Sequence, residues 1–133
     1  MYRILIYSFL FFAIDQLSKW LVVFFLQLST KLTIDLNNQF LNFHMAWNKG
    51  INFGLFESES LTQVYFLFLI SVLISLALFF WVRKTKNYAI QLSSALVIGG
   101  AVGNAIDRLL YGSVADFINL TCCGVKIPFS FNL

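Results

Sequence analysis

Residues Gly99 to Asn119 read GGAVGNAIDRLLYGSVADFIN, and this stretch decides how the rest of the chain is interpreted. A run of apolar and small residues leads into Asp107 and Arg108, and a second carboxylate, Asp116, follows. Insertion scales give a charged side chain at the centre of a membrane helix a cost of about 2.5–3.5 kcal/mol. Charged residues at the end of an apolar helix therefore indicate a functional site.

The composition is that of a membrane protein. The 133 residues are 59% hydrophobic and 11% charged, whereas about 25% of the residues of a soluble domain are charged. We expect one membrane domain over residues 1–133. The net charge of +3 comes from scattered lysines and arginines, which argues against nucleic acid as a partner. Cys122 and Cys123 are adjacent and His44 is the single histidine, so we expect no metal and no other cofactor.

Three long apolar runs predict three transmembrane helices, over residues 4–28, 61–82 and 88 to about 109. Arg3 and the basic turn at 83–87 fall on the same side of the membrane in this arrangement. The positive-inside rule then places the N-terminus and this turn in the cytoplasm. The third helix consequently runs outward and brings its charged end to the outer face.

The first run is interrupted by Asp15 and Lys19, which stand four residues apart on one helix face. An acid followed by a base at this spacing forms a favourable pair. The pair belongs to the half of the helix away from the N-terminus. It is either an intrahelical pair that lowers the cost of insertion or part of a site.

The segment between the first two runs has a different pattern. Residues 30–36 alternate between apolar and polar side chains, and residues 40–47 continue as a second extended segment after an Asn-Asn turn at 37–38. A period of two predicts strands. We therefore expect a small sheet at the outer surface of the membrane.

The carboxylates favour hydrolytic chemistry. Two close aspartates cannot both ionise, so one stays protonated and polarises a carbonyl while the other activates water. The residues by themselves nominate Asp107 and Asp116 as such a pair, in an aspartic protease. An alternative from another class is a small proton-relay or transport subunit in which these aspartates and Asp15 titrate.

Three motifs follow one another along the chain. They are D-Q-x-S-K at Asp15 to Lys19, N-x-G-x-x-F-G at Asn48 to Gly54, and G-N-x-x-D-R-x-x-x-G-x-V-x-D-F at Gly103 to Phe117. In this order they resemble the motif boxes of the lipoprotein signal peptidases, signal peptidase II. The resemblance covers nearly the whole chain, and its third box is highly specific.

This resemblance implies an aspartic endopeptidase of the bacterial inner membrane, with four helices and a periplasmic β-cradle between helices 1 and 2. Such an enzyme removes signal peptides from diacylglyceryl-modified prolipoproteins and cleaves before the lipidated cysteine. Its expected partners are these prolipoproteins and membrane lipid, and its active site faces the periplasm.

The resemblance also implies roles for individual residues. Asp116 corresponds to one catalytic aspartate, while Asp107 takes a supporting role, in which we expect it to pair with the neighbouring Arg108. The full set of supporting positions is Asp15, Lys19, Asn48, Gly54, Asn104, Asp107, Arg108 and Asn132.

The family's last box reads F-N-x-A-D and opens a fourth helix, whereas this sequence reaches Phe131, Asn132 and Leu133. We expect the second catalytic aspartate beyond Leu133. The chain of 133 residues is then C-terminally incomplete, and an inactive truncated copy is the alternative to an active enzyme.

Overall fold

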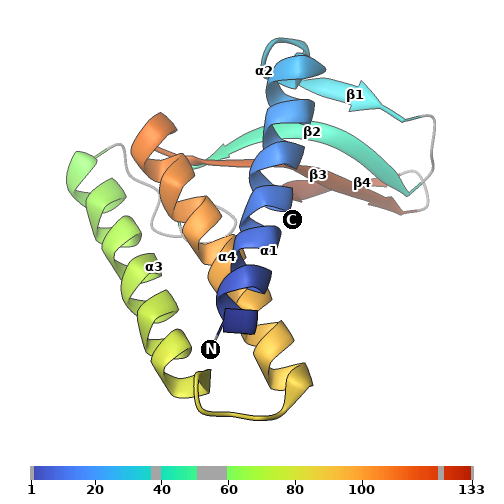
Figure 1. Ribbon diagram of the computed structural model, residues 1–133. Helices are drawn as coiled ribbons and strands as arrows, with labels where there is room; N and C mark the ends of the chain where they lie inside the picture. The colour runs from blue at the N-terminus through green and yellow to red at the C-terminus, as the bar shows by residue number, and fades with distance from the viewer. Residues whose placement is uncertain (1, 37–39, 51–59, 123–124, 133) are drawn as a thin grey trace.

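The computed structural model describes residues 2–36, 40–50, 60–122 and 125–132. Three long helices stand side by side, and a four-stranded antiparallel sheet lies across one end of them (Figure 1). The turn between the second and third long helices lies at the opposite end. The protein therefore has a helical part and a sheet part, and the sheet meets the helices at the end opposite this turn.

The three predicted transmembrane helices are confirmed. The spans Tyr2–Phe25, Leu61–Val82 and Tyr88–Tyr111 are each long and apolar enough to cross a membrane. The first consists of α1 (Tyr2–Lys19), which continues directly into the π-helix η1 (Trp20–Phe25). The other two are α3 (Leu61–Val82) and α4 (Tyr88–Tyr111). Helices satisfy their own backbone hydrogen bonds, which an apolar solvent requires.

Side chains and a glycine mark the ends of α4. The Asn87 side chain accepts hydrogen bonds from the backbone N–H groups of Ala89 and Ile90 and so caps the first turn. Gly112 follows the helix with a φ of +72°, a left-handed conformation that glycine adopts without strain. This turn sends the chain out of the helix and into the sheet.

Helix α4 lies between α1 and α3 and packs against both. Gly99 makes the α1 contact possible, because a Cβ atom there would lie 2.6 Å from the carbonyl oxygen of Ser8 and 2.9 Å from the backbone nitrogen of Phe12. A Cβ atom on Gly103 would collide with a carboxylate oxygen of Asp15. Small residues thus let the two helix backbones approach closely where the polar residues meet.

The sheet has the order β1-β2-β3-β4, with antiparallel neighbours throughout. Strands β1 (Thr33–Asp35) and β2 (Leu41–Asn48) confirm the strands predicted between the first two membrane helices. The predicted first strand begins too early, because the short helix α2 (Leu28–Lys31) occupies its start. The expected turn at 37–38 lies outside the described residues.

The other half of the sheet follows α4 and was not predicted from the sequence. It consists of β3 (Val114–Cys122) and β4 (Val125–Phe131). Residues 114–117 are buried on both faces of β3, so the apolar-polar alternation that reveals a strand is missing there. The sheet is therefore built from two distant parts of the chain rather than from the segment between helices 1 and 2 alone.

The apolar core beneath the sheet connects it to the helical part. Val22 and Val23 of η1 pack with Met45 of β2 and with Ala115 and Phe117 of β3. This core fixes the position of β3 and β2 relative to η1.

Candidate active site

A buried lysine joins α1 to α4. The Nζ atom of Lys19 donates hydrogen bonds to Asp15 Oδ2 at 2.8 Å and Asn104 Oδ1 at 2.9 Å, and it forms an ion pair with Asp107 Oδ2 at 2.8 Å. Lys19, Asp15 and Asp107 are each at most 4% exposed. One buried ammonium thus contacts two carboxylates and one amide oxygen. The predicted Asp15–Lys19 pair is thus confirmed, and it forms part of a larger cluster.

Gln16 reinforces the same junction, and sequence reasoning missed it. Its Nε2 atom donates to Asp107 Oδ1 at 3.0 Å and to the Gly103 carbonyl at 3.3 Å. The Ala115 backbone N–H lies 3.5 Å from Asp107 Oδ2 and adds a bond from β3. Asp107 therefore links α1, α4 and β3. Gln16 is the second residue of the D-Q-x-S-K motif, and this position was the signal that could have identified it.

Asp116 has a separate environment, made of amides. Asn48 Nδ2 donates to Asp116 Oδ2 at 2.9 Å, and Asn132 Nδ2 donates to Asp116 Oδ1 at 2.6 Å. Burial raises the pKa of this carboxyl, and the two amide donors, together with the charges of Lys19 and Arg108, oppose the rise. Asp116 is thereby a buried acid whose proton is held more tightly than in water.

Arg108 does not pair with Asp107, so the expected pairing was wrong. Its Nη2 atom donates to the Gly50 carbonyl at 3.0 Å, and its Nη1 atom donates to the Asn104 carbonyl at 3.3 Å. Adjacent residues on a helix point about 100° apart, and Asp107 turns toward Lys19 instead. Arg108 thus anchors the backbone that follows β2 to the end of α4.

The predicted site residues therefore form two adjoining groups. The first group contains Asp15, Lys19, Asn104 and Asp107, and the second contains Asn48, Asp116 and Asn132, with Arg108 contributing its charge to Asp116. Gly54 lies outside the described residues. All the other predicted positions belong to these two groups.

A groove between α1 and α4 leads to the first group. It encloses about 760 Å³ and has mostly apolar walls, which include Phe11, Ile14 and Leu96. Asp15 and Asn104 also line it and supply its polar part. Among the residues described, no group of three or more His, Cys, Asp or Glu side chains lies together to hold a metal ion.

These features define a class: a multi-pass helical membrane protein with buried carboxylates where its helices meet a small antiparallel sheet. The sequence pattern of the signal peptidase (SPase) II family matches residues 7–133, and the chain belongs to that family.

Individual relatives agree. The chain is 39% identical over 115 residues to a lipoprotein signal peptidase of Coxiella burnetii (strain RSA 331 / Henzerling II), a match that covers 85% of this chain and 69% of that protein. It is 36% identical over 85 residues to a lipoprotein signal peptidase of Methylobacterium radiotolerans, covering 64% of this chain and 50% of that protein. The chain thus spans about half to two thirds of the length of these relatives.

Two solved structures share the fold. Both are described as a bacterial membrane enzyme, at 2.3 and 1.9 Å resolution, and both are 27% identical in sequence to this chain. The TM-scores are 0.76 and 0.71, and each match covers 97% of this chain and 76% or 80% of the solved chain.

Proposed function

We propose that this chain carries one half of the catalytic pair of a lipoprotein signal peptidase, an aspartic endopeptidase that removes signal peptides from diacylglyceryl-modified prolipoproteins. One observation carries the proposal. Asn48, Asp116 and Asn132 come from three separate parts of the sequence and meet at one buried carboxylate. This is the arrangement that a titrating catalytic acid requires.

Asp116 is the catalytic aspartate in this proposal. Its pKa is raised by burial, so it holds a proton more readily than an ordinary aspartate does. The family's last motif supplies the second carboxylate of the pair. The short contact between Asn132 and Asp116 supports this assignment, because it brings the end of the described chain to the catalytic carboxyl.

Asp107 has a supporting role rather than a catalytic one. Its Oδ2 atom forms an ion pair with the ammonium of Lys19, and its Oδ1 atom accepts a hydrogen bond from Gln16. Both carboxylate oxygens are thus engaged in contacts that join α4 to α1. Asp107 also bonds the backbone of Ala115 and thereby positions the strand that carries Asp116.

The groove between α1 and α4 suits the apolar part of a signal peptide. Its walls are apolar side chains of two membrane helices, and Asp15 and Asn104 provide its polar part. A mostly apolar cavity with a few polar groups binds an apolar ligand and fixes its orientation. We assign the prolipoprotein to this groove and membrane lipid to the remaining surface of the helices.

We further propose that the protein lies in the bacterial inner membrane with its N-terminus in the cytoplasm. The basic residues Arg83, Lys84 and Lys86 lie between α3 and α4, at the end away from the sheet (Figure 1). The positive-inside rule favours the cytoplasm for this end. The sheet and Asp116 then face the periplasm.

Cleavage of a diacylglyceryl-modified prolipoprotein tests the proposal. A chain extended by the family's last motif and a fourth helix is expected to cleave. In the extended chain, Asp116→Asn keeps the size of the side chain and should lower the rate by at least ~10²-fold. Asp35→Asn, on the exposed side of β1, is the matched control and should cleave normally. Normal cleavage by the Asp116→Asn variant would refute the assignment.

A further inference from the structure

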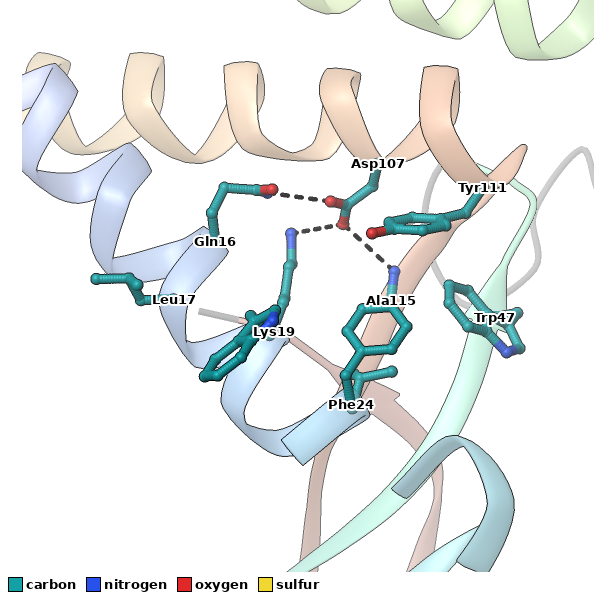
Figure 2. A pocket seen from close by; sticks show the side chains of 10 residues that line it. Gln16, Leu17, Lys19, Phe24, Trp47, Asp107, Tyr111 and Ala115 are labelled. Carbon is teal, nitrogen blue, oxygen red and sulfur yellow. Dashed lines mark hydrogen bonds and ion pairs between the residues drawn. The ribbon is translucent and has the colours of Figure 1, made fainter. Parts of the chain in front are cut away.

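A second cavity lies where η1, the end of α4 and β2 meet (Figure 2). Its volume is about 260 Å³, below the ~300–1,000 Å³ of pockets that hold drug-sized ligands. It therefore suits a small chemical group rather than a peptide. Its position at the sheet end of two membrane spans, which end at Phe25 and Tyr111, corresponds to the headgroup level of a bilayer.

This cavity shares Lys19 and Asp107 with the first group of site residues, but it lies on the other face of β3 from the proposed catalytic Asp116. Ala115 lines it, and Asp116 is the next residue of β3. Successive side chains of a strand point to opposite faces. Asn48 and Asn132, which bind Asp116, are not among the residues that line the cavity. Whatever occupies the cavity contacts the opposite face of the strand.

Aromatic rings form the wall of the cavity. Trp20 and Phe24 come from η1, Tyr111 from the end of α4 and Trp47 from β2. The Tyr111 ring lies 5.9 Å from Phe24 and 5.7 Å from Trp47, centroid to centroid. A π-helix within a longer helix is rare and often occurs at a functional site, and here it supplies two of the four rings. Each ring side chain is at least 37% exposed, so the wall is open to a ligand.

The polar floor of the cavity consists of Gln16, Lys19 and Asp107. The Lys19 ammonium lies within 2.9 Å of the carboxylates of Asp15 and Asp107 and of the Asn104 amide oxygen, so these groups compensate its charge. Figure 2 shows the Asp107 carboxylate directed toward the cavity, beside the ring of Tyr111.

We propose that this cavity binds the ammonium group of a zwitterionic phospholipid headgroup. Aromatic faces attract cations, and sets of such rings recognise quaternary ammonium groups. Tryptophan and tyrosine at membrane interfaces are common as plain anchors. In this protein the rings line one cavity, and the buried Asp107 carboxylate lies behind them. Plain membrane anchors need neither a shared cavity nor a carboxylate.

Binding of short-chain lipids to the full chain in a non-ionic detergent tests the inference. Dihexanoyl phosphatidylcholine and phosphatidylethanolamine should bind saturably and raise the unfolding temperature, whereas dihexanoyl phosphatidylglycerol should not. Tyr111→Leu should weaken binding by roughly threefold to thirtyfold, the contribution of one cation–π contact. Tyr111→Phe keeps the ring and should bind normally.

The matched control is Trp81→Leu, an aromatic residue of α3 that is 74% exposed and does not line the cavity. It should leave binding unchanged. Equal binding of all three lipids, a preference for phosphatidylglycerol, or equal weakening by Trp81→Leu would overturn the proposal. None of these readouts involves cleavage, so the assignment of Asp116 is tested independently.

A second measurement, of fluorescence quenching, leaves the residues of the cavity unchanged. A phosphatidylcholine with a nitroxide on its headgroup should quench the fluorescence of Trp20 and Trp47. In the Trp81→Phe variant these are the two remaining tryptophans, and saturable quenching should persist. Absence of quenching in that variant would overturn the inference.

Discussion

The ammonium of Lys19 and the carboxylate of Asp107 lie 2.8 Å apart and join the first membrane helix to the last one described. The two side chains are at most 5% exposed. Removing one partner of a buried ion pair is strongly destabilising, because the other charge remains buried without compensation. The Asp15–Lys19 pair of α1 is therefore also a contact between α1 and α4, because Lys19 binds Asp107 as well.

Exchanging the charges of that pair should damage the fold. Asp15→Lys combined with Lys19→Asp preserves an i, i+4 pair in the weaker orientation, but it places a carboxylate against Asp107. We expect a loss of about 3–5 kcal/mol in the free energy of unfolding, measured by denaturant titration in detergent. Lys31→Asp, at an exposed lysine of α2, should change it by less than about 0.5 kcal/mol. Normal folding and cleavage with the exchange would show that the pair serves insertion alone.

Two adjacent glycines of α4 should respond in opposite directions to the same substitution. Gly99→Ala pushes a methyl group against the backbone of α1 and should cost about 1–3 kcal/mol. Gly100→Ala meets no atom within 4 Å and should be neutral or stabilise by up to about 1 kcal/mol. Thermal unfolding followed by tryptophan fluorescence compares them directly. Equal effects would contradict the close contact between α1 and α4.

The stability of the protein should depend on pH through Asp116. Its pKa is raised in the folded state, so folding favours the protonated form. This contribution is fully present below the ordinary pKa of 3.8 and is lost as the pH rises through the higher folded-state pKa. The Asp116→Asn variant should therefore lose less stability than the native chain as the pH rises from about 4 to 7.

Unfolding curves at several pH values measure this difference between the two proteins. Trp81→Phe, at an exposed residue of α3 without a titratable group, serves as the control, and its stability should follow the native pH dependence. Parallel curves for Asp116→Asn and the native chain would show that the Asp116 carboxyl is not perturbed.

Membrane orientation can be measured with two single-cysteine variants. In a chain without Cys122 and Cys123, Thr30→Cys lies beside the sheet and Thr85→Cys lies between α3 and α4. We expect an impermeant thiol reagent to label position 30 in intact spheroplasts, and position 85 only after the membrane is opened. Labelling of position 85 from outside would reverse the proposed orientation and the location of the site.

Local patterns were sufficient to predict much of the helical part. Twenty or more apolar residues form a membrane helix because the bilayer requires internal backbone hydrogen bonds, so the spans follow from composition alone. The Asp15–Lys19 pair follows from helix periodicity in the same way. The motifs likewise identified most residues of the candidate site before their positions were known.

Contacts between distant segments required the tertiary structure. Whether Asp107 pairs with Arg108 or with Lys19 depends on which face of α4 meets α1, and close packing at Gly99 and Gly103 decides that. Residues 114–117 of β3 are buried on both faces, so the start of this strand has no periodic signature in the sequence. The meeting of Asn48, Asp116 and Asn132 depends on the pairing of this strand with β2. Periodicity records the contacts within one element, whereas packing between elements determines which polar groups share a buried site.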